Sequence, residues 1–257
     1  MRFAKWRYYA RSLWLMLFTI KNWTSLVPAL LTKRGRILRL AELQFFYRDA
    51  MDVWTIKETC LDDCYRTAER SVAPGDVVLD IGAGLGDCAI MLAKRYPQAR
   101  VFAFEPFPQS AALCQRNVAL NHVANVTVRE CAVGGSSGTA SLDISSPESV
   151  QYSTVSGPGN STVVVQKRTL AEVFADHAIE RCALLKLDCE GAEFEILLTL
   201  ELPFFARIAA ISLEYHDGVT GHQHTELVLL LRRAGYTLTQ VTNPVHAHLG
   251  YLYAYRP

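Results

Sequence analysis

Hydrophobic and polar positions follow one pattern up to about residue 70 of this chain and a different pattern beyond it. The first part predicts helices throughout. From Pro74-Gly75 onward, short β-branched runs alternate with helical stretches, which is typical of a parallel sheet covered by helices on both faces. The pattern therefore predicts an α/β fold with a mostly parallel sheet and an N-terminal helical extension.

Seven apolar runs are expected to form the strands of this sheet. They span residues 77–81, 101–104, 126–133, 184–187, 208–214, 236–241 and 249–255. Helices are expected near residues 87–96, 108–120, 192–200 and 223–234. The segment 134–169 is rich in Ser, Gly and Thr and holds two β-prone pieces, 139–144 and 162–166. It predicts a hairpin-like excursion from the sheet, close to the substrate.

Charge separates the two parts of the chain. The sequence has 26 basic and 25 acidic residues, and nine of the basic ones precede the first acidic residue, Glu42. With 257 residues, half of them hydrophobic, the chain can bury one large core. We therefore expect a basic helical extension over residues 1–55 and one α/β domain over residues 56–257. The basic extension is either a solvated helix face or a surface that docks on a membrane, an acidic carrier protein or nucleic acid.

Two features bear on the cellular compartment. The apolar run Leu13 to Ile20 is too short to span a bilayer, which needs ~20 residues. It has the layout of a secretory signal, but no small-x-small cleavage site follows it cleanly. The seven cysteines form no C-x-x-C pair and read as reduced core residues. A cytoplasmic location follows, with peripheral membrane association through the basic extension as an addition.

The strongest local motif is a glycine-rich turn between a predicted strand and a predicted helix, Asp80-Ile-Gly82-Ala83-Gly84-Leu-Gly86-Asp87. Glycines at such a turn let the backbone approach a ligand closely. A dinucleotide site needs G-x-G-x-x-G, but Asp87 stands where the last glycine would be, and two carboxylates disfavour a pyrophosphate. The turn instead suits the amino-acid moiety of S-adenosylmethionine, bound in a Rossmann-like fold.

A second acidic residue, Glu105, ends the next predicted strand and precedes Pro106. In folds of this kind a carboxylate about twenty residues beyond the glycine turn accepts the ribose hydroxyls. Taken alone, Glu105 also fits an acid that caps a helix beginning at a proline. Together with the glycine turn, it favours cofactor binding.

These motifs resemble a known family. Residues 77–105 look like the first motifs of class I S-adenosylmethionine-dependent methyltransferases. Residues 184–193, Leu-Leu-Lys-Leu-Asp-Cys-Glu-Gly-Ala-Glu, resemble the L-K-I-D-x-E-G-x-E signature of the FkbM family. Weaker likeness in residues 51–65 and 168–170 extends the match over roughly residues 46–217.

The resemblance implies a methyltransferase domain over residues 56–257 and O-methylation of hydroxyls on small molecules, polyketides or sugars. It also implies that Glu130-Cys131-Ala132, at the end of the third strand, contacts the adenine ring. The expected partner is a small-molecule or sugar-containing acceptor, whose identity the sequence does not give.

Candidate catalytic residues lie at the expected ligand edge of the sheet. Asp188 ends a predicted strand and is also expected to contact the cofactor, and Glu190 and Glu193 follow it. Three carboxylates so close together repel one another unless some are protonated or meet cations. Glu193 fits the start of a helix, where negative charge is favoured. His216, two residues after Glu214 on the next strand, is either a general base or a structural histidine, so the candidates for the base are Asp188, Glu190 and His216.

Metal chemistry has weaker support in the sequence. Asp188 and Glu214 echo the positions that hold magnesium in catechol O-methyltransferases, but two oxygen ligands are a thin basis for a Mg²⁺ site. The His-x-His pairs at 222 and 224 and at 246 and 248 lack further ligands at a zinc spacing. We therefore expect S-adenosylmethionine as the cofactor and give Mg²⁺ little weight.

Other function classes remain open on sequence alone. The basic, aromatic N-terminal region favours a nucleic-acid methyltransferase, but the chain has no Asp/Asn-Pro-Pro-aromatic motif and no Pro-Cys after the fourth strand to act on a flipped base. A non-catalytic S-adenosylmethionine-binding protein and an NAD-dependent oxidoreductase are the further alternatives.

Overall fold

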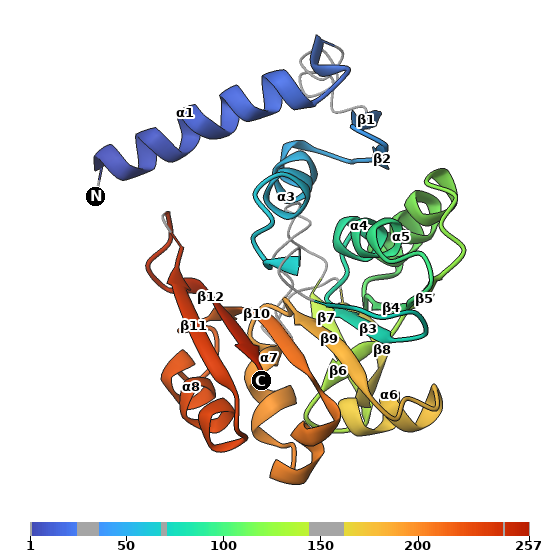
Figure 1. Cartoon of the computed structure of the whole chain (residues 1–257), viewed down its shortest axis with the longest axis vertical. Helices are drawn as coiled ribbons and strands as arrows, with labels where there is room; N and C mark the ends of the chain where they lie inside the picture. The colour runs from blue at the N-terminus through green and yellow to red at the C-terminus, as the bar shows by residue number, and fades with distance from the viewer. Residues whose placement is uncertain (1, 25–35, 68–70, 144–161, 244, 257) are drawn as a thin grey trace.

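The protein is described by a computed structural model covering residues 2–24, 36–67, 71–143, 162–243 and 245–256. Its centre is a seven-stranded sheet of order β11-β12-β10-β9-β3-β4-β5 (Figure 1). The strands are β3 (Val77–Ile81), β4 (Arg100–Phe104), β5 (Val126–Arg129), β9 (Cys182–Leu187), β10 (Ala210–His216), β11 (Thr237–Thr242) and β12 (Leu249–Tyr255). Neighbouring strands run parallel except that β12 is antiparallel to β10 and β11. The predicted mostly parallel sheet is confirmed.

Helices cover both faces of this sheet (Figure 1). One face carries α3 (Ala50–Cys60), α4 (Asp87–Arg95) and α5 (Pro108–Leu120), and the other carries α6 (Leu170–Asp176), α7 (Ala192–Leu198) and α8 (His224–Arg233). Within β3, Val78 packs on the first face, while Leu79 packs on the second. Because successive side chains point to opposite faces and both faces are buried, the strands are continuous apolar runs.

The order of the strands reverses beside β3. The chain passes from β3 to β4 and β5 on one side, and later enters β9 and β10 on the other side. In open α/β sheets, ligands bind beyond the carboxyl ends of the strands at such a switch point. The glycine turn follows β3 and Asp188 follows β9, so both motifs lie at this point.

The N-terminal part contains a hairpin that the sequence analysis missed. Between α1 (Arg2–Thr19) and α3, strands β1 (Ile37–Leu40) and β2 (Leu43–Phe46) pair in antiparallel fashion. The expectation of helices throughout this part was therefore wrong. Leu38 and Leu40 are buried on either side of the exposed Arg39, which is the period of a strand.

Asn117 of α5 and Asn121, which follows the end of that helix, attach this hairpin to the α/β domain. The backbone N–H of Phe46 donates to Asn117 Oδ1 over 2.7 Å, and that of Gln44 donates to Asn121 Oδ1 over 2.9 Å. Both asparagine side chains also donate back to carbonyl oxygens of β2. Hydrogen bonds from asparagine side chains to the backbone of β2 thus hold the hairpin, and the pattern of hydrophobic residues does not predict such contacts.

A separate three-stranded sheet arises from the Ser- and Gly-rich insert. It consists of β6 (Ala132–Gly134), β8 (Thr162–Thr169) and β7 (Gly138–Asp143), with β7 antiparallel to β8. The predicted strand 126–133 is therefore two strands in two sheets, because the chain turns at residues 129–131, where the Cys131 N–H donates to the Arg129 carbonyl. The end of the expected piece 139–144 lies outside the described residues.

The N-terminal helix α1 lies beyond α3, on the side away from the sheet (Figure 1). It exposes Trp6, Trp14 and Phe18, and no helix among the described residues is both long and apolar enough to cross a membrane. Contact of this helix with a membrane or a carrier protein stays a prediction. So does the division after residue 55, a position that lies within α3.

Candidate functional site

The glycine turn brings the end of β3 against the loop that follows β9. Gly82 has φ +74°, and a Cβ there would lie 1.8 Å from the carbonyl oxygen of Asp188. Only glycine permits this approach. Gly84 has φ +53°, but a Cβ there would meet nothing within 4 Å, so it borders open space. The turn therefore leaves a hollow that a side chain at residue 84 would enter.

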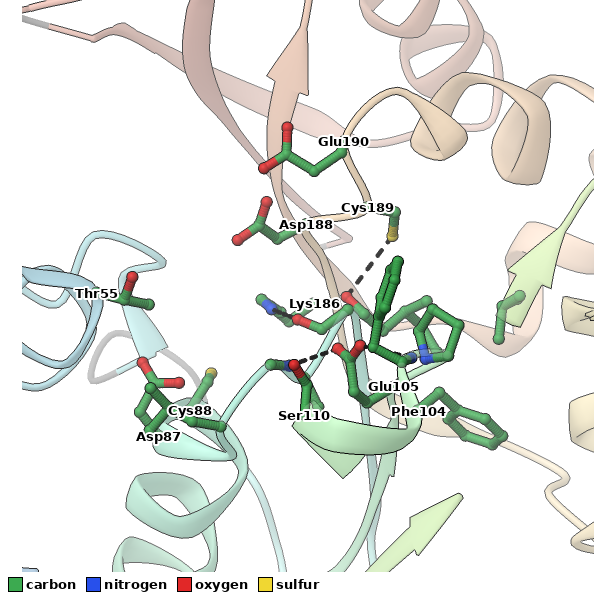
Figure 2. Close-up of a pocket in the computed structure, with 18 of the residues that line it drawn as sticks. Thr55, Asp87, Cys88, Phe104, Glu105, Ser110, Lys186, Asp188, Cys189 and Glu190 are labelled. Atoms are coloured by element: carbon green, nitrogen blue, oxygen red, sulfur yellow. Dashed lines mark hydrogen bonds between the residues drawn. The ribbon is translucent and has the colours of Figure 1, made fainter. Parts of the chain in front are cut away.

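Two cavities open at this edge of the sheet. The glycine-turn cavity, of about 140 Å³, is bordered by the turn, by Glu105 and by Asp188 (Figure 2). The carboxylate cavity, of about 530 Å³, is bordered by Glu58, Glu214 and His216. The residues that border both are Thr55, Thr59, Tyr65, Asp188 and Glu190. A group bound in one cavity therefore shares a wall with a group bound in the other.

Most of the residues expected to bind the cofactor border the glycine-turn cavity. They are Gly82, Ala83, Gly84, Asp87, Glu105, Pro106, Cys131, Ala132 and Asp188. Three differ from expectation. Gly86 is the N-cap of α4, and a Cβ there would lie 2.6 Å from Cys114 Sγ. Glu130 is exposed to solvent, and Asp80 is fully buried behind the turn.

Two buried carboxylates offer acceptors inside this cavity. Glu105 accepts the N–H of Gly84 over 2.8 Å and the N–H of Phe107 over 2.9 Å, and burial raises its pKa to about 7. Asp87, 4% exposed, has a pKa raised by burial to about 6, and its Oδ2 has no hydrogen-bond partner among the described residues. Buried acceptors of this kind gain free energy when a ligand brings hydroxyl or ammonium donors.

Asp80 has a structural partner that the sequence analysis did not identify. Lys186, on β9, lies with its Nζ 2.9 Å from Asp80 Oδ1 and donates to the Gly82 carbonyl over 2.7 Å. The Asp80 charge is among the causes that raise the pKa of Lys186 well above its usual value against the opposing effect of burial. Asp80 thus fixes the turn through Lys186. A lysine inside an apolar strand was the available signal, since such a charge needs a buried partner.

A cluster of acidic side chains and one histidine forms the wall of the carboxylate cavity. Tyr65 Oη donates to Asp188 Oδ2 over 2.7 Å. His216 Nε2 lies 3.8 Å from Asp188 Oδ1 and 3.5 Å from Glu190 Oε2. The structure therefore brings the three predicted catalytic candidates together, and Figure 2 shows Asp188 and Glu190 directed to the side on which Thr55 lies.

Glu193 holds His216 in place. Its Oε1 accepts the His216 backbone N–H over 2.9 Å and lies 3.0 Å from His216 Nδ1, while its Oε2 accepts the Gly191 N–H over 2.8 Å. Burial lowers the pKa of His216, but the hydrogen bond to Glu193 and the charges of Glu193, Glu190 and Asp188 outweigh it and raise that pKa to about 10. A free histidine titrating near its ordinary ~6.5 is therefore not what the site contains.

Two other carboxyl groups of this cluster, those of Glu190 and Glu214, also have raised pKa values. Burial, together with the charge of Asp188, raises the pKa of Glu190 to about 7 against the opposing charge of His216. Burial and the charge of Asp188 also raise the pKa of Glu214 well above its usual value. Glu190 has φ +51°, a left-handed conformation that costs a non-glycine residue ~1 to 3 kcal/mol. With this strained backbone, the side chain of Glu190 lies at the wall that the two cavities share.

The His-x-His pairs have neighbours of their own. His224 Nδ1 lies 2.6 Å from Asp217 Oδ2, and His222 Nδ1 lies 3.0 Å from Glu226 Oε2, both at the start of α8. The rings of His246 and His248 pack edge to face and border the carboxylate cavity. The first pair therefore belongs to a helix start, and the second to a cavity wall.

Aromatic rings complete the carboxylate cavity on the side of the N-terminal helices. Tyr8 and Tyr9 of α1 and Trp54 of α3 border it, with their ring centroids 5.6 to 5.9 Å apart. Tyr8 Oη donates to Glu58 Oε1 over 2.5 Å, which ties α1 to α3. The basic extension is therefore part of the wall of the site.

Known proteins are similar to this chain in sequence. The family described as methyltransferase FkbM domain matches residues 80–238. The chain is 28% identical to 31-O-demethyl-FK506 methyltransferase FkbM of Streptomyces tacrolimicus, over 80% of this chain and 86% of that protein. It is 29% identical to methyltransferase sdnD of Sordaria araneosa, over 61% of this chain and 68% of that protein.

A solved structure has a similar fold. The structure of methyltransferase FkbM from Methylobacillus flagellatus superposes with a TM-score of 0.50 at 16% identity, and the match covers 79% of this chain and 52% of that one. At this identity the likeness concerns the fold, and the chain spans about half the length of that protein.

Proposed function

Because this chain belongs to the FkbM methyltransferase family, we propose that it transfers the methyl group of S-adenosylmethionine to a hydroxyl oxygen of a small-molecule or sugar-containing acceptor that is not an anion. The observation that carries this proposal is the wall shared by the two cavities. Asp188 and Glu190 border both, so a donor in one and an acceptor in the other meet at a pair of carboxylates.

The glycine-turn cavity fits the cofactor. When bound, S-adenosylmethionine supplies a methyl group activated by its sulfonium. Glu105 is placed to accept the ribose hydroxyls, and Asp87 Oδ2 is a buried acceptor without a partner for the amino group. Cys131 and Ala132 border the same cavity and are proposed to contact the adenine ring.

The charge of the carboxylate cavity supports the class of acceptor. Glu58, Asp188, Glu190 and Glu214 border it, and no Lys or Arg is among its described lining residues. A phosphate would meet four carboxylates there, and the cation that His216 contributes to this wall is already paired with Glu193. A phosphorylated metabolite or a nucleic acid is therefore a poor acceptor, whereas a hydroxyl that donates to carboxylates is a good one.

The residues of the shared wall have two tasks, to position the acceptor and to remove its proton. Orientation of two bound reactants can contribute ~7 to 11 kcal/mol, and a general base a factor of ~100 to 10,000. Asp188 already accepts from Tyr65, and His216 is held by Glu193. Glu190 has no hydrogen bond to another described residue and borders both cavities. We therefore propose that Glu190 is the general base that takes the proton from the acceptor hydroxyl.

Product analysis with labelled cofactor tests this proposal. Purified protein is given S-adenosylmethionine carrying a deuterated ¹³C-methyl group and a panel of sugars, polyketide-type alcohols and their phosphorylated counterparts. We expect the label on an oxygen of an uncharged or cationic acceptor, and its loss in Glu190→Gln at unchanged cofactor affinity. A label found on nitrogen, on a phosphorylated acceptor or on nucleic acid would contradict the proposal, as would cofactor binding with no transfer to any acceptor.

A further inference from the structure

His216 has the hydrogen-bond arrangement of a histidine that binds a metal. Metal-ligating histidines donate their other ring N–H to a carboxylate, which fixes the tautomer and orients the ring. Glu193, fully buried, lies 3.0 Å from His216 Nδ1 and also accepts the His216 backbone N–H. Nδ1 is therefore bonded to Glu193, and Nε2 is the nitrogen that faces the carboxylate cavity.

The Nε2 atom faces two acidic side chains at ion-pair distance, without a close hydrogen bond to either. His216 is 4% exposed, and its Nε2 lies 3.5 Å from Glu190 Oε2 and 3.8 Å from Asp188 Oδ1, beyond the range of a good hydrogen bond. Without a metal, this nitrogen carries a proton and forms long ion pairs with the two carboxylates, and a bound dication would take the place of that proton. The structure thus holds a buried donor atom directed into the cavity.

Two oxygen ligands complete the group. One ligand atom each from Asp188, Glu214 and His216 lies within 4.8 Å of the others. Metal–ligand bonds of ~2.0 to 2.6 Å allow two ligands of one ion to be up to ~5 Å apart, so this spread fits a single cation. Asp188 also receives a hydrogen bond from Tyr65, so two of the three ligands have an outer partner that orients them.

We propose that Asp188, Glu214 and His216 bind one divalent cation of the Mg²⁺ or Mn²⁺ class at the wall between the two cavities. Two carboxylates and an imidazole are ligands that Mn²⁺ accepts readily and that leave positions open for water or substrate. A dication also offsets the excess of negative charge among the described residues that line the carboxylate cavity. Asp188 and Glu214 were recognisable from the sequence, and the structure adds His216 as a third ligand that Glu193 orients.

The role of the cation rests on the methyltransferase function proposed above. The acceptor hydroxyl would occupy an open coordination position, where its oxygen is polarised and loses its proton more easily. Asp188 borders both cavities, so the coordinated oxygen would lie next to the glycine-turn cavity. Glu190, next to the proposed site but outside the ligand set, is the group left to take the proton.

Electron paramagnetic resonance of Mn²⁺ tests the site without requiring an acceptor. The full chain is titrated with Mn²⁺ in the presence of S-adenosylhomocysteine, and free Mn²⁺ is followed by its six-line signal. We expect about one equivalent to bind, and Glu214→Gln or Asp188→Asn to weaken binding at least ~10-fold. The matched control is Glu180→Gln, an exposed carboxylate that follows the loop after α6 and should leave affinity unchanged.

Spin-echo modulation by nitrogen identifies the histidine directly. Wild-type protein should show coupling of Mn²⁺ to an imidazole ¹⁴N, and His216→Gln should lose it. Glu193→Gln, which keeps an acceptor but removes the charge behind the ring, should weaken Mn²⁺ binding by ~10 to 100-fold. Circular dichroism and S-adenosylhomocysteine calorimetry on each variant show whether it is folded.

The outcomes separate this inference from the proposed function. No saturable Mn²⁺ binding by protein that binds S-adenosylhomocysteine would overturn the cation site, as would a nitrogen signal that persists in His216→Gln. Methylation that continues after treatment with a chelator would also overturn it and leave the methyltransferase proposal intact. Mn²⁺ binding with the expected variant pattern, but no methyl transfer to any acceptor, would support the site and contradict the proposed function.

Discussion

Lys186 Nζ lies 2.9 Å from Asp80 Oδ1, and both side chains are buried beneath the glycine turn. The same Nζ donates to the Gly82 carbonyl over 2.7 Å. One ammonium group therefore joins the end of β3, the turn and β9. The spacing between the two loops that border the glycine-turn cavity depends on this contact, and so does the position of Asp188 two residues further on.

The first prediction concerns the stability of this pair. Lys186→Met leaves the Asp80 carboxylate buried without its cation, which costs ~3 to 5 kcal/mol in comparable sites. The free energy of unfolding, measured by urea denaturation, should fall by that order. Arg168→Met is the control, since Arg168 pairs with Asp176 over 3.9 Å with about half of each side chain exposed and should change stability by ~0 to 1 kcal/mol.

A double variant sharpens this test. Replacing both partners with apolar residues, Asp80→Leu with Lys186→Met, removes the unpaired charge and should recover part of the lost stability. Destabilisation equal to the sum of the single variants would contradict the pairing.

Asp80 shows how far the sequence could lead at this site. The strand, the turn and the following helix were predictable because apolar run, glycines and amphipathic pattern follow in order. The direction of the Asp80 side chain was not, because it depends on a lysine 106 positions later that enters from a neighbouring strand. We expect Asp80→Ala to disturb folding as well as cofactor affinity, which makes it a poor probe of binding.

The second prediction uses Gly84 as a cleaner probe. Gly84→Val would place a branched side chain in the glycine-turn cavity, because a Cβ at this residue meets no protein atom within 4 Å. We expect calorimetry to show loss of S-adenosylmethionine binding in protein that remains folded. Gly75→Val is the matched control, because Gly75 also has a positive φ and open space around it but does not border the cavity.

The two variants should carry a similar backbone strain, so a comparable drop in stability is expected for both. Equal cofactor affinity in the two variants would show that the cofactor does not occupy the hollow at Gly84.

The third prediction follows from the pKa of Glu105, which burial raises from 4.5 to about 7. The folded protein then holds a proton that the unfolded chain releases, so ionisation of Glu105 costs stability as pH rises from 4.5 to 7. Ribose hydroxyls donate to the ionised form, so cofactor affinity should rise with pH. A one-unit fall of this pKa on binding would strengthen affinity by up to ~10-fold over the whole titration, and by ~3-fold between pH 6.5 and 8.

Calorimetry with S-adenosylhomocysteine in buffers of different ionisation enthalpy measures the released proton. The ligand's own amino group titrates near ~7.7 to 8.0, so the informative quantity is the difference between wild type and Glu105→Gln. The variant should bind more weakly and lose the pH-dependent part. An identical proton release in both proteins would place the titrating group elsewhere.

The parts of the fold that escaped prediction share a physical reason. The β1–β2 hairpin is short, and its attachment depends on Asn117 and Asn121, which lie more than 70 residues away in the sequence. The link between Glu193 and His216 likewise joins the start of α7 to the end of β10. Hydrophobic periodicity reports local burial, whereas these contacts are specific polar pairs between distant segments.

The last prediction concerns the N-terminal helix as a wall of the acceptor site. Tyr9 of α1 borders the carboxylate cavity and is 39% exposed, with its ring 5.6 Å from that of Trp54. An aromatic ring at such a place stacks on the face of a bound acceptor, and removing it loses ~0.5 to 1.5 kcal/mol of contact. Tyr9→Ala should therefore raise the KM for the acceptor several-fold, with cofactor affinity and kcat little changed. Trp6→Ala is the control, because Trp6 lies on the same helix, is 75% exposed and does not border the cavity.

Steady-state kinetics with any acceptor found by product analysis measures both variants. If Tyr9→Ala leaves the KM for the acceptor as unchanged as Trp6→Ala does, Tyr9 takes no part in acceptor binding.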